Sequence, residues 1–141
     1  HLIIMKRKGS AVWNGSLKEG SGTVSLESGI LKDTTYSFKT RFEDGKNGTN
    51  PEELIGAAHA GCFSMQLSAN LTEEGFAPDK LETTSEITFE DGKVTKSHLV
   101  LKAAVPGIDE DKFDEIVQDA KNNCPISQLL NAEITLSYDL N

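Results

Sequence analysis

The sequence predicts an α+β fold in a single domain, and three observations indicate it. Glycine-broken segments with strand character fill the first 45 residues. A long uncharged segment follows from about residue 50 to 74, and a hairpin, two helices and a strand occupy residues from about 80 to 141. Strands and helices grouped in this order are typical of α+β proteins. The 141 residues suffice for one domain whose core needs no metal or disulfide.

The domain is expected to span residues 5–141. Residues 1–4 precede Met5, which has the position of a natural start, and we interpret them as a remnant of expression. Their apolar run is too short for a secretory signal peptide, so the cytoplasm is the expected compartment. In the first part of the domain we expect three short strands, around Ser10–Trp13, Gly22–Leu26 and Tyr36–Phe42.

A long helix is predicted from about residue 50 to 74. Asn50 can cap it, Pro51 suits its first position, and Glu53 lies where a capping box places a carboxylate. Gly75 and Pro78 should end it. Leu54–Thr72 contains no charged residue and is about long enough to cross a bilayer, but it carries polar side chains throughout. We therefore expect a helix surrounded by protein on most sides.

The C-terminal part shows the two-residue periodicity of a half-buried β-strand. Over Leu81–Phe89 the apolar side chains Leu81, Ile87 and Phe89 all fall in one set of alternate positions, and the other set is polar throughout. The Asp91-Gly92 pair predicts a tight turn, and Leu99–Val105 forms the return strand. Asp109 should begin an amphipathic helix that buries four side chains. They are Phe113, Ile116, Val117 and Ala120. A short helix from Cys124-Pro125 to about Leu130 and a strand over Ile134–Leu140 complete the domain.

The charge balance excludes several classes of partner. The chain carries 22 acidic and 14 basic side chains, for a net charge of -8, and no basic stripe. Nucleic acids and anionic membrane surfaces both require clustered Lys and Arg, so neither is expected to bind. No P-loop, GxGxxG, serine nucleophile elbow or metal-ligand spacing is present, and we expect no cofactor and no metal.

Two cysteines, Cys62 and Cys124, remain as candidates for chemistry. In the cytoplasm they are either inert core thiols or a redox couple. Cys62 lies deep in the long helix, about 18 Å beyond its start, so the helix dipole cannot lower the pKa of its thiol. A cation must do so. His59, one turn earlier, and Arg41, among aromatic neighbours, are the candidates, although His59 could equally be a hydrogen-bonded core histidine.

Cys124 is placed differently. Because Pro125 suits the first position of a helix, Cys124 falls at the N-cap, where free backbone N–H groups favour a thiolate. Cysteine is a poor capping residue compared with Ser or Asp, so its presence at this position favours a functional role for it. On helix electrostatics alone, Cys124 is the thiol that ionises more easily.

Over residues 5–141 the chain resembles a known family, the OsmC/Ohr hydroperoxide reductases. The run Gly48–Met65, with Gly-Ala-Ala-His-Ala-Gly-Cys-Phe at its centre, carries most of the resemblance. Further matching segments are Gly22–Ser25, Glu27–Gly29, Thr40–Glu43, Val105–Asp109 and Cys124–Gln128. The resemblance implies antiparallel sheets that wrap a long buried central helix in an intertwined homodimer.

The family's activity is implied in the same way, as a thiol peroxidase for organic hydroperoxides that uses neither haem nor metal. Cys62 matches the peroxidatic cysteine and Cys124 the resolving one, while Arg41 and Glu52 match an Arg–Glu pair that polarises the thiol. Lipoylated dithiol proteins are the reductants that the resemblance implies. An apolar mouth that includes Phe42, Phe63 and Met65 would favour an organic chain over hydrogen peroxide.

Two alternatives and one geometric problem stay open. The chain could instead be a dimeric module that binds hydrophobic ligands with inert cysteines, or a general thiol–disulfide oxidoreductase, against which the lack of a CxxC spacing counts. Glu52 and Cys62 are separated by about 15 Å along a straight helix. Either Arg41 spans that distance or the helix is interrupted, for example at Gly56 or Gly61.

Overall fold

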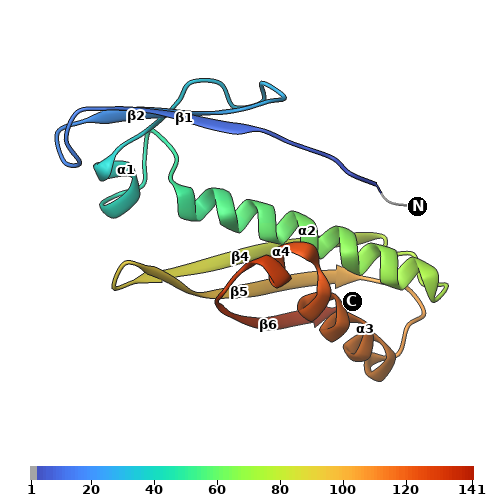
Figure 1. Cartoon of the computed structure of the whole chain (residues 1–141). Coiled ribbons are helices and arrows are strands. Elements are labelled where there is room, and N and C mark those ends of the chain that lie inside the picture. Colours follow the sequence, from blue (N-terminus) through green and yellow to red (C-terminus); the bar gives the residue numbers. More distant parts are fainter. Residues whose placement is uncertain (1–2) are drawn as a thin grey trace. The chain divides into compact units, whose positions relative to one another are not determined.

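The computed structural model describes residues 3–141, so His1 and Leu2 of the expected expression remnant lie outside the described residues. The chain forms two compact units that divide between Pro51 and Glu52 (Figure 1). Each is described by itself below.

The first unit is a small antiparallel sheet with one short helix. Its strands are β1 (Gly9–Asn14), β2 (Ser21–Leu26) and β3 (Thr34–Tyr36), in the order β1-β2-β3. Gly22 of β2 leaves room for two aromatic rings to pack over the strand. A Cβ at this position would lie 2.6 Å from both the Trp13 and the Tyr36 ring, and these two rings meet edge to face at 5.3 Å. The first two predicted strands are confirmed.

The third predicted strand, Tyr36–Phe42, is wrong beyond its first residue. Phe38–Phe42 forms a helix, α1, and β3 ends at Tyr36. The cause is a capping box: the Ser37 hydroxyl accepts from the Thr40 N–H, and the Thr40 hydroxyl accepts from the Ser37 N–H. These two local hydrogen bonds favour a helical turn over the extended backbone that the aromatic residues suggested.

The second unit contains the long helix and a second sheet. Its elements are α2 (Pro51–Glu73, which begins at the last residue of the first unit), β4 (Lys80–Glu90), β5 (Lys93–Ala104), α3 (Glu110–Asn123), α4 (Pro125–Leu129) and β6 (Glu133–Leu140). The strands run in the order β4-β5-β6. Asp91 and Gly92 both adopt positive φ, as the predicted hairpin turn requires.

The expectation of purely antiparallel sheets is wrong at one edge. β4 and β5 are antiparallel, but β6 pairs with β5 in parallel. The chain leaves β5, passes through α3 and α4 and returns in the same direction, and a connection of this length brings a strand back parallel. The alternation in the sequence defines which side chains share a face and carries no information about strand direction.

The long helix matches its prediction closely and is uninterrupted. It ends one residue before the predicted Glu74, where Gly75 takes a φ of +89° and Phe76 N–H donates to Leu71 O at 2.8 Å. Neither Gly56 nor Gly61 breaks it. Gly56 instead permits close packing on β4, since a Cβ there would lie 3.1 Å from the Ser85 carbonyl oxygen.

The core of the second unit lies between this helix, the sheet and α3. Figure 1 shows α2, in green, running along the sheet, with α3 beside it. Alternate residues of β5 are buried beneath them, among them Leu99 and Leu101, which join Phe63 and Leu67 of α2 and Phe113 of α3. Asp109 caps α3 as predicted, its carboxylate accepting from Lys112 N–H.

Within the second unit only one face of α2 is covered, whereas the sequence predicted cover on most sides. The buried residues recur at helical spacing from Gly56 to Leu71. The opposite face exposes a stripe of small and apolar residues: Ala57, Ala58, Gly61, Met65 and Ala69. Among the described residues, no helix combines the length and the apolar character that a membrane span needs.

Candidate functional site

The structure brings the two cysteines together, although 62 positions separate them in the sequence. Cys62 lies in the middle of α2 and is half-buried, while Cys124 lies between α3 and α4 and is fully buried. Both are free thiols, and they lie close enough that Cys124 raises the pKa of the Cys62 thiol. The site is therefore a pair of adjacent thiols of unequal exposure.

The first turn of α4 holds both sulfur atoms. Cys124 is the N-cap of this helix, as predicted, and its Sγ accepts from the Ser127 N–H at 3.4 Å. The neighbouring Ile126 N–H lowers the pKa of the Cys62 thiol. Pro125 at the first position fixes the turn. The start of α4 thus acts on both cysteines.

The environment of Cys62 favours its protonated form. Burial raises the pKa of the Cys62 thiol most, the Ile126 N–H lowers that pKa, and the neighbouring Cys124 raises it further. A thiolate is the nucleophilic form of cysteine. For Cys62 to act as a nucleophile near neutral pH, its pKa has to be lowered further than the Ile126 N–H lowers it, and a nearby cation would do so.

An open groove of about 520 Å³ leads to Cys62. Its other lining residues are mostly apolar: Ala58, Met65, Gln66, Ala69, Pro125 and Ile126. Met65, predicted at the mouth, lies there and is 78% exposed. The prediction that Phe63 also lies at the mouth is wrong. This side chain is completely buried, because it lies on the face of α2 that packs on the sheet.

His59 is buried and hydrogen-bonded at both ring nitrogens, which confirms the interpretation as a core histidine. Its Nδ1 lies 2.6 Å from the Ser97 hydroxyl of β5, and its Nε2 lies 2.7 Å from the Ser127 hydroxyl of α4. Burial lowers the pKa of His59, so the ring is neutral near neutral pH. It is therefore no cation for Cys62.

Sequence reasoning missed the two serines, Ser97 and Ser127. The Ser127 hydroxyl lies 3.1 Å from Cys124 Sγ, so it bridges the cysteine and the histidine. One local signal could have found Ser127: it occupies the third position after the N-cap cysteine, where capping contacts are made. No pattern in the sequence points to Ser97.

Arg41 and Glu52 belong to different units of the chain. Arg41 lies on α1, with its guanidinium 5.1 Å from the centre of the Phe42 ring, and lines a cavity of about 240 Å³ with Trp13 and Tyr36. Glu52 lies in the first turn of α2. That α2 continues unbroken past Gly56 and Gly61 removes the interrupted helix as a way to join Glu52 and Cys62. The grouping of Arg41 and Glu52 with the cysteines stays a prediction.

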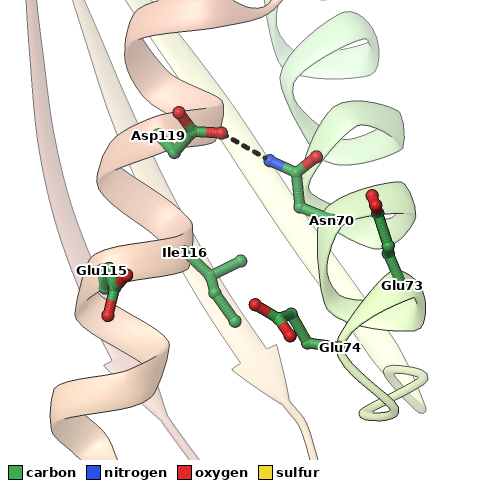
Figure 2. A pocket seen from close by; sticks show the side chains of 6 residues that line it. All are labelled: Asn70, Glu73, Glu74, Glu115, Ile116 and Asp119. Carbon is green, nitrogen blue, oxygen red and sulfur yellow. Dashed lines mark hydrogen bonds between the residues drawn. The ribbon is translucent and has the colours of Figure 1, made fainter.

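A second groove, of about 560 Å³, has no thiol and lies away from the cysteines. Figure 2 shows its lining from the end of α2 and from α3: Asn70, Glu73, Glu74, Glu115, Ile116 and Asp119. Asn70 donates to Asp119 at 3.1 Å across it. Its first residue is about 12 Å beyond Cys62 along the helix. Within residues 3–141, no three metal-binding side chains come together.

Comparison with known proteins gives consistent results. The model of the family described as OsmC-like protein matches residues 43–139. The chain is 54% identical over 142 aligned positions to peroxiredoxin OsmC of Escherichia coli strain K12, covering 98% of this chain and 99% of that protein. It is 31% identical over 103 positions to an organic hydroperoxide resistance protein of Xanthomonas axonopodis pv. citri, covering 68% and 69%.

Solved structures share the fold. The organic hydroperoxide resistance protein OhrB of Bacillus subtilis superposes with a TM-score of 0.63 at 23% identity, covering 95% of this chain and 98% of that one. An OsmC-like protein of unknown function from Vibrio cholerae gives a TM-score of 0.73 at 14% identity, covering 96% and 100%. With the family match over most of its length and the relative of 54% identity, this chain belongs to the OsmC family.

Proposed function

We propose that this chain is a thiol peroxidase that reduces organic hydroperoxides to alcohols in the cytoplasm. The observation that carries the proposal is the pair of free thiols close together, one at an open groove and one fully buried. Membership of a family with a relative called a peroxiredoxin, and the likeness to an organic hydroperoxide resistance protein, support the same chemistry.

The unequal exposure of the thiols supports an order of action. Cys62, which a hydroperoxide can reach through the groove, attacks the distal peroxide oxygen as a thiolate. The O–O bond breaks, the alkoxide takes a proton and leaves as the alcohol, and Cys62 becomes a sulfenic acid. Cys124 then attacks the Cys62 sulfur, so that hydroxide leaves and becomes water. The product is a Cys62–Cys124 disulfide, which an external dithiol reduces by exchange.

Arg41 is proposed as the cation that stabilises the Cys62 thiolate, with Glu52 holding its guanidinium. The need for a cation comes from the Cys62 environment, where burial and Cys124 raise the pKa of the thiol. The choice of Arg41 and Glu52 comes from the family resemblance. A planar guanidinium that also donates hydrogen bonds can orient the peroxide oxygens while it stabilises the thiolate.

Arg41→Gln should lower the rate of Cys62 oxidation roughly 100-fold near neutral pH. Without the cation the pKa of Cys62 rises, so the thiolate fraction at a given pH falls and the rate profile moves to higher pH. Stopped-flow measurement of hydroperoxide consumption across pH 6–10 checks this. Lys39→Gln, on the same helix and with an exposed ion pair to Asp44, is the matched control and should leave the profile in place. An unchanged profile in Arg41→Gln would remove Arg41 from the site.

A homodimer is proposed as the functional form. Within the second unit the stripe of small and apolar residues on α2 is exposed, with Met65 at its centre. An uncharged helix face of this kind is typical of an interface, and the family resemblance implies that a second copy packs against it. Because Ala58, Met65 and Ala69 also line the groove that leads to Cys62, the groove would then open at the edge of this interface. Sedimentation equilibrium should give twice 15.3 kDa, and a mass of one chain at micromolar concentration would contradict the dimer.

The experiment for the function is turnover of the wild-type protein with dihydrolipoamide, a dithiol of the lipoyl class. Cumene hydroperoxide should be consumed at least roughly tenfold faster than hydrogen peroxide, because the groove beside Cys62 is lined mostly by apolar side chains. The assay follows loss of hydroperoxide by iron–xylenol orange. If folded, fully reduced protein consumes neither peroxide, the peroxidase assignment fails, and a hydrophobic-ligand module with inert cysteines takes its place.

A further inference from the structure

The role of His59 is left open by the proposed peroxidase mechanism, on which the following inference rests. We propose that His59 is a positioning residue that moves the proton of Cys124 out of the buried site, through Ser127, when Cys124 attacks the sulfenic acid of Cys62. The juxtaposition that supports it is an unbroken line of hydrogen-bonding groups from Cys124 to β4.

The line runs across four elements. Cys124 Sγ lies 3.1 Å from Ser127 Oγ on α4, which lies 2.7 Å from His59 Nε2 on α2. His59 Nδ1 lies 2.6 Å from Ser97 Oγ on β5, and Ser97 Oγ lies 2.7 Å from Ser85 Oγ on β4. Each neighbouring pair is within hydrogen-bonding distance, so a proton can pass along the line without a gap.

Burial favours such a path. Cys124, His59 and Ser97 are each completely buried, while Ser85 at the far end is half-buried. A thiol must lose its proton to attack, and the proton of a fully buried thiol cannot pass directly to water. The far end of the line at Ser85 gives it a route toward the surface.

The groups along the line fit both protonation states of Cys124. In the thiol state, Cys124 donates to Ser127, Ser127 to Nε2, Nδ1–H to Ser97, and Ser97 to Ser85. In the thiolate state every bond is reversed: Ser85 donates to Ser97, Ser97 to Nδ1, Nε2–H to Ser127, and Ser127 to the sulfur. A neutral imidazole has one donor and one acceptor nitrogen, and serine hydroxyls both donate and accept, so both arrangements are satisfied.

The proton balance is complete. One proton leaves Cys124 for Ser127, Ser127 passes its own to Nε2, and Nδ1 releases a proton to Ser97 and onward to Ser85 and solvent. The histidine exchanges one proton for another and stays neutral, in agreement with its burial. The hydroxide expelled from Cys62 takes a proton from solvent to form water, so disulfide formation releases no net proton.

The groups hydrogen-bonded to His59 from β5 and α4 are the hydroxyls of Ser97 and Ser127. Cys124 is linked to it through Ser127. Burial is the cause that lowers the pKa of His59, and it disfavours a trapped imidazolium.

The test separates the two half-reactions in single-turnover experiments with cumene hydroperoxide. His59→Gln should form the Cys62 sulfenic acid at the wild-type rate. Its disulfide formation, followed by loss of free thiol, should be roughly 100-fold slower. The rate of that step should rise tenfold for each pH unit, because hydroxide must then remove the proton. His98→Gln is the matched control: this half-buried histidine of β5 also bridges two hydroxyls, of Thr135 and Ser137, and leads to no cysteine.

Ser97→Ala distinguishes a proton path from mere support of Ser127. This change cuts the outward link and leaves the Ser127 contacts with His59 and Cys124 in place. The proposal expects it to slow disulfide formation as His59→Gln does. Ser97→Ala also provides the test of the relay if His59→Gln does not fold. A wild-type rate and pH profile for disulfide formation in Ser97→Ala or in folded His59→Gln would overturn the relay. A wild-type protein that forms no sulfenic acid would instead refute the peroxidase itself.

Discussion

Cys62→Ser is expected to abolish hydroperoxide reduction, with a fall in kcat/KM of roughly 10³-fold or more. A serine hydroxyl cannot be ionised to a useful extent near neutral pH, and the groove beside position 62 has no other thiol at its surface, because Cys124 is fully buried. The measurement is the initial rate of cumene hydroperoxide loss with dihydrolipoamide. Circular dichroism checks that the variant keeps the wild-type fold.

The matched control for this variant is Leu129→Met, which alters an exposed apolar residue of α4 outside the groove and leaves both thiols in place. It should retain turnover within a few fold. Wild-type turnover in Cys62→Ser would mean that another group attacks the peroxide, and the assignment of Cys62 would fall.

Cys124→Ser is expected to complete one turnover and then stall. Cys62 still reaches the hydroperoxide through the groove, so one equivalent of alcohol forms at the wild-type rate. The sulfenic acid then has no neighbouring thiol to attack it and accumulates. Steady-state turnover should fall roughly 100-fold or more. Serine suits the buried position, since its hydroxyl can keep the N-cap contact with Ser127 N–H.

Trapping with dimedone, followed by peptide mass analysis, should find the adduct on Cys62 in this variant in nearly full yield. In the wild-type protein the adduct should be scarce, because Cys124 captures the sulfenic acid first. Continued fast turnover in Cys124→Ser with no trapped adduct would show that the external dithiol alone resolves the intermediate.

Local signals in the sequence predicted much of the second unit. The Asp91-Gly92 turn, the Asp109 cap and the Gly75 stop each involve residues a few positions apart, so the sequence contains the whole interaction. The same kind of signal was overlooked at Ser37 and Thr40, whose capping box makes Phe38–Phe42 a helix. The parallel pairing of β6 with β5 depends on a long connection, which residue alternation does not encode.

The site was predictable only in part, for a related reason. The Pro125 signal identified Cys124 as an N-cap, and the structure confirms it. The contact between Cys62 and Cys124 depends on how α4 packs on α2, and no spacing rule contains that information. The same holds for the bridge from His59 to Ser127. Phe63 and Met65, two residues apart, were both predicted at the mouth, although they lie on different faces of α2.

The most direct test of the central claim is the covalent state of the wild-type protein after one equivalent of cumene hydroperoxide without reductant. The mechanism predicts an intact mass lower by two hydrogen atoms and a single peptide cross-link between Cys62 and Cys124, reversed by dihydrolipoamide. A protein that consumes the hydroperoxide and keeps two free thiols, or that cross-links only between chains, would contradict the two-cysteine mechanism.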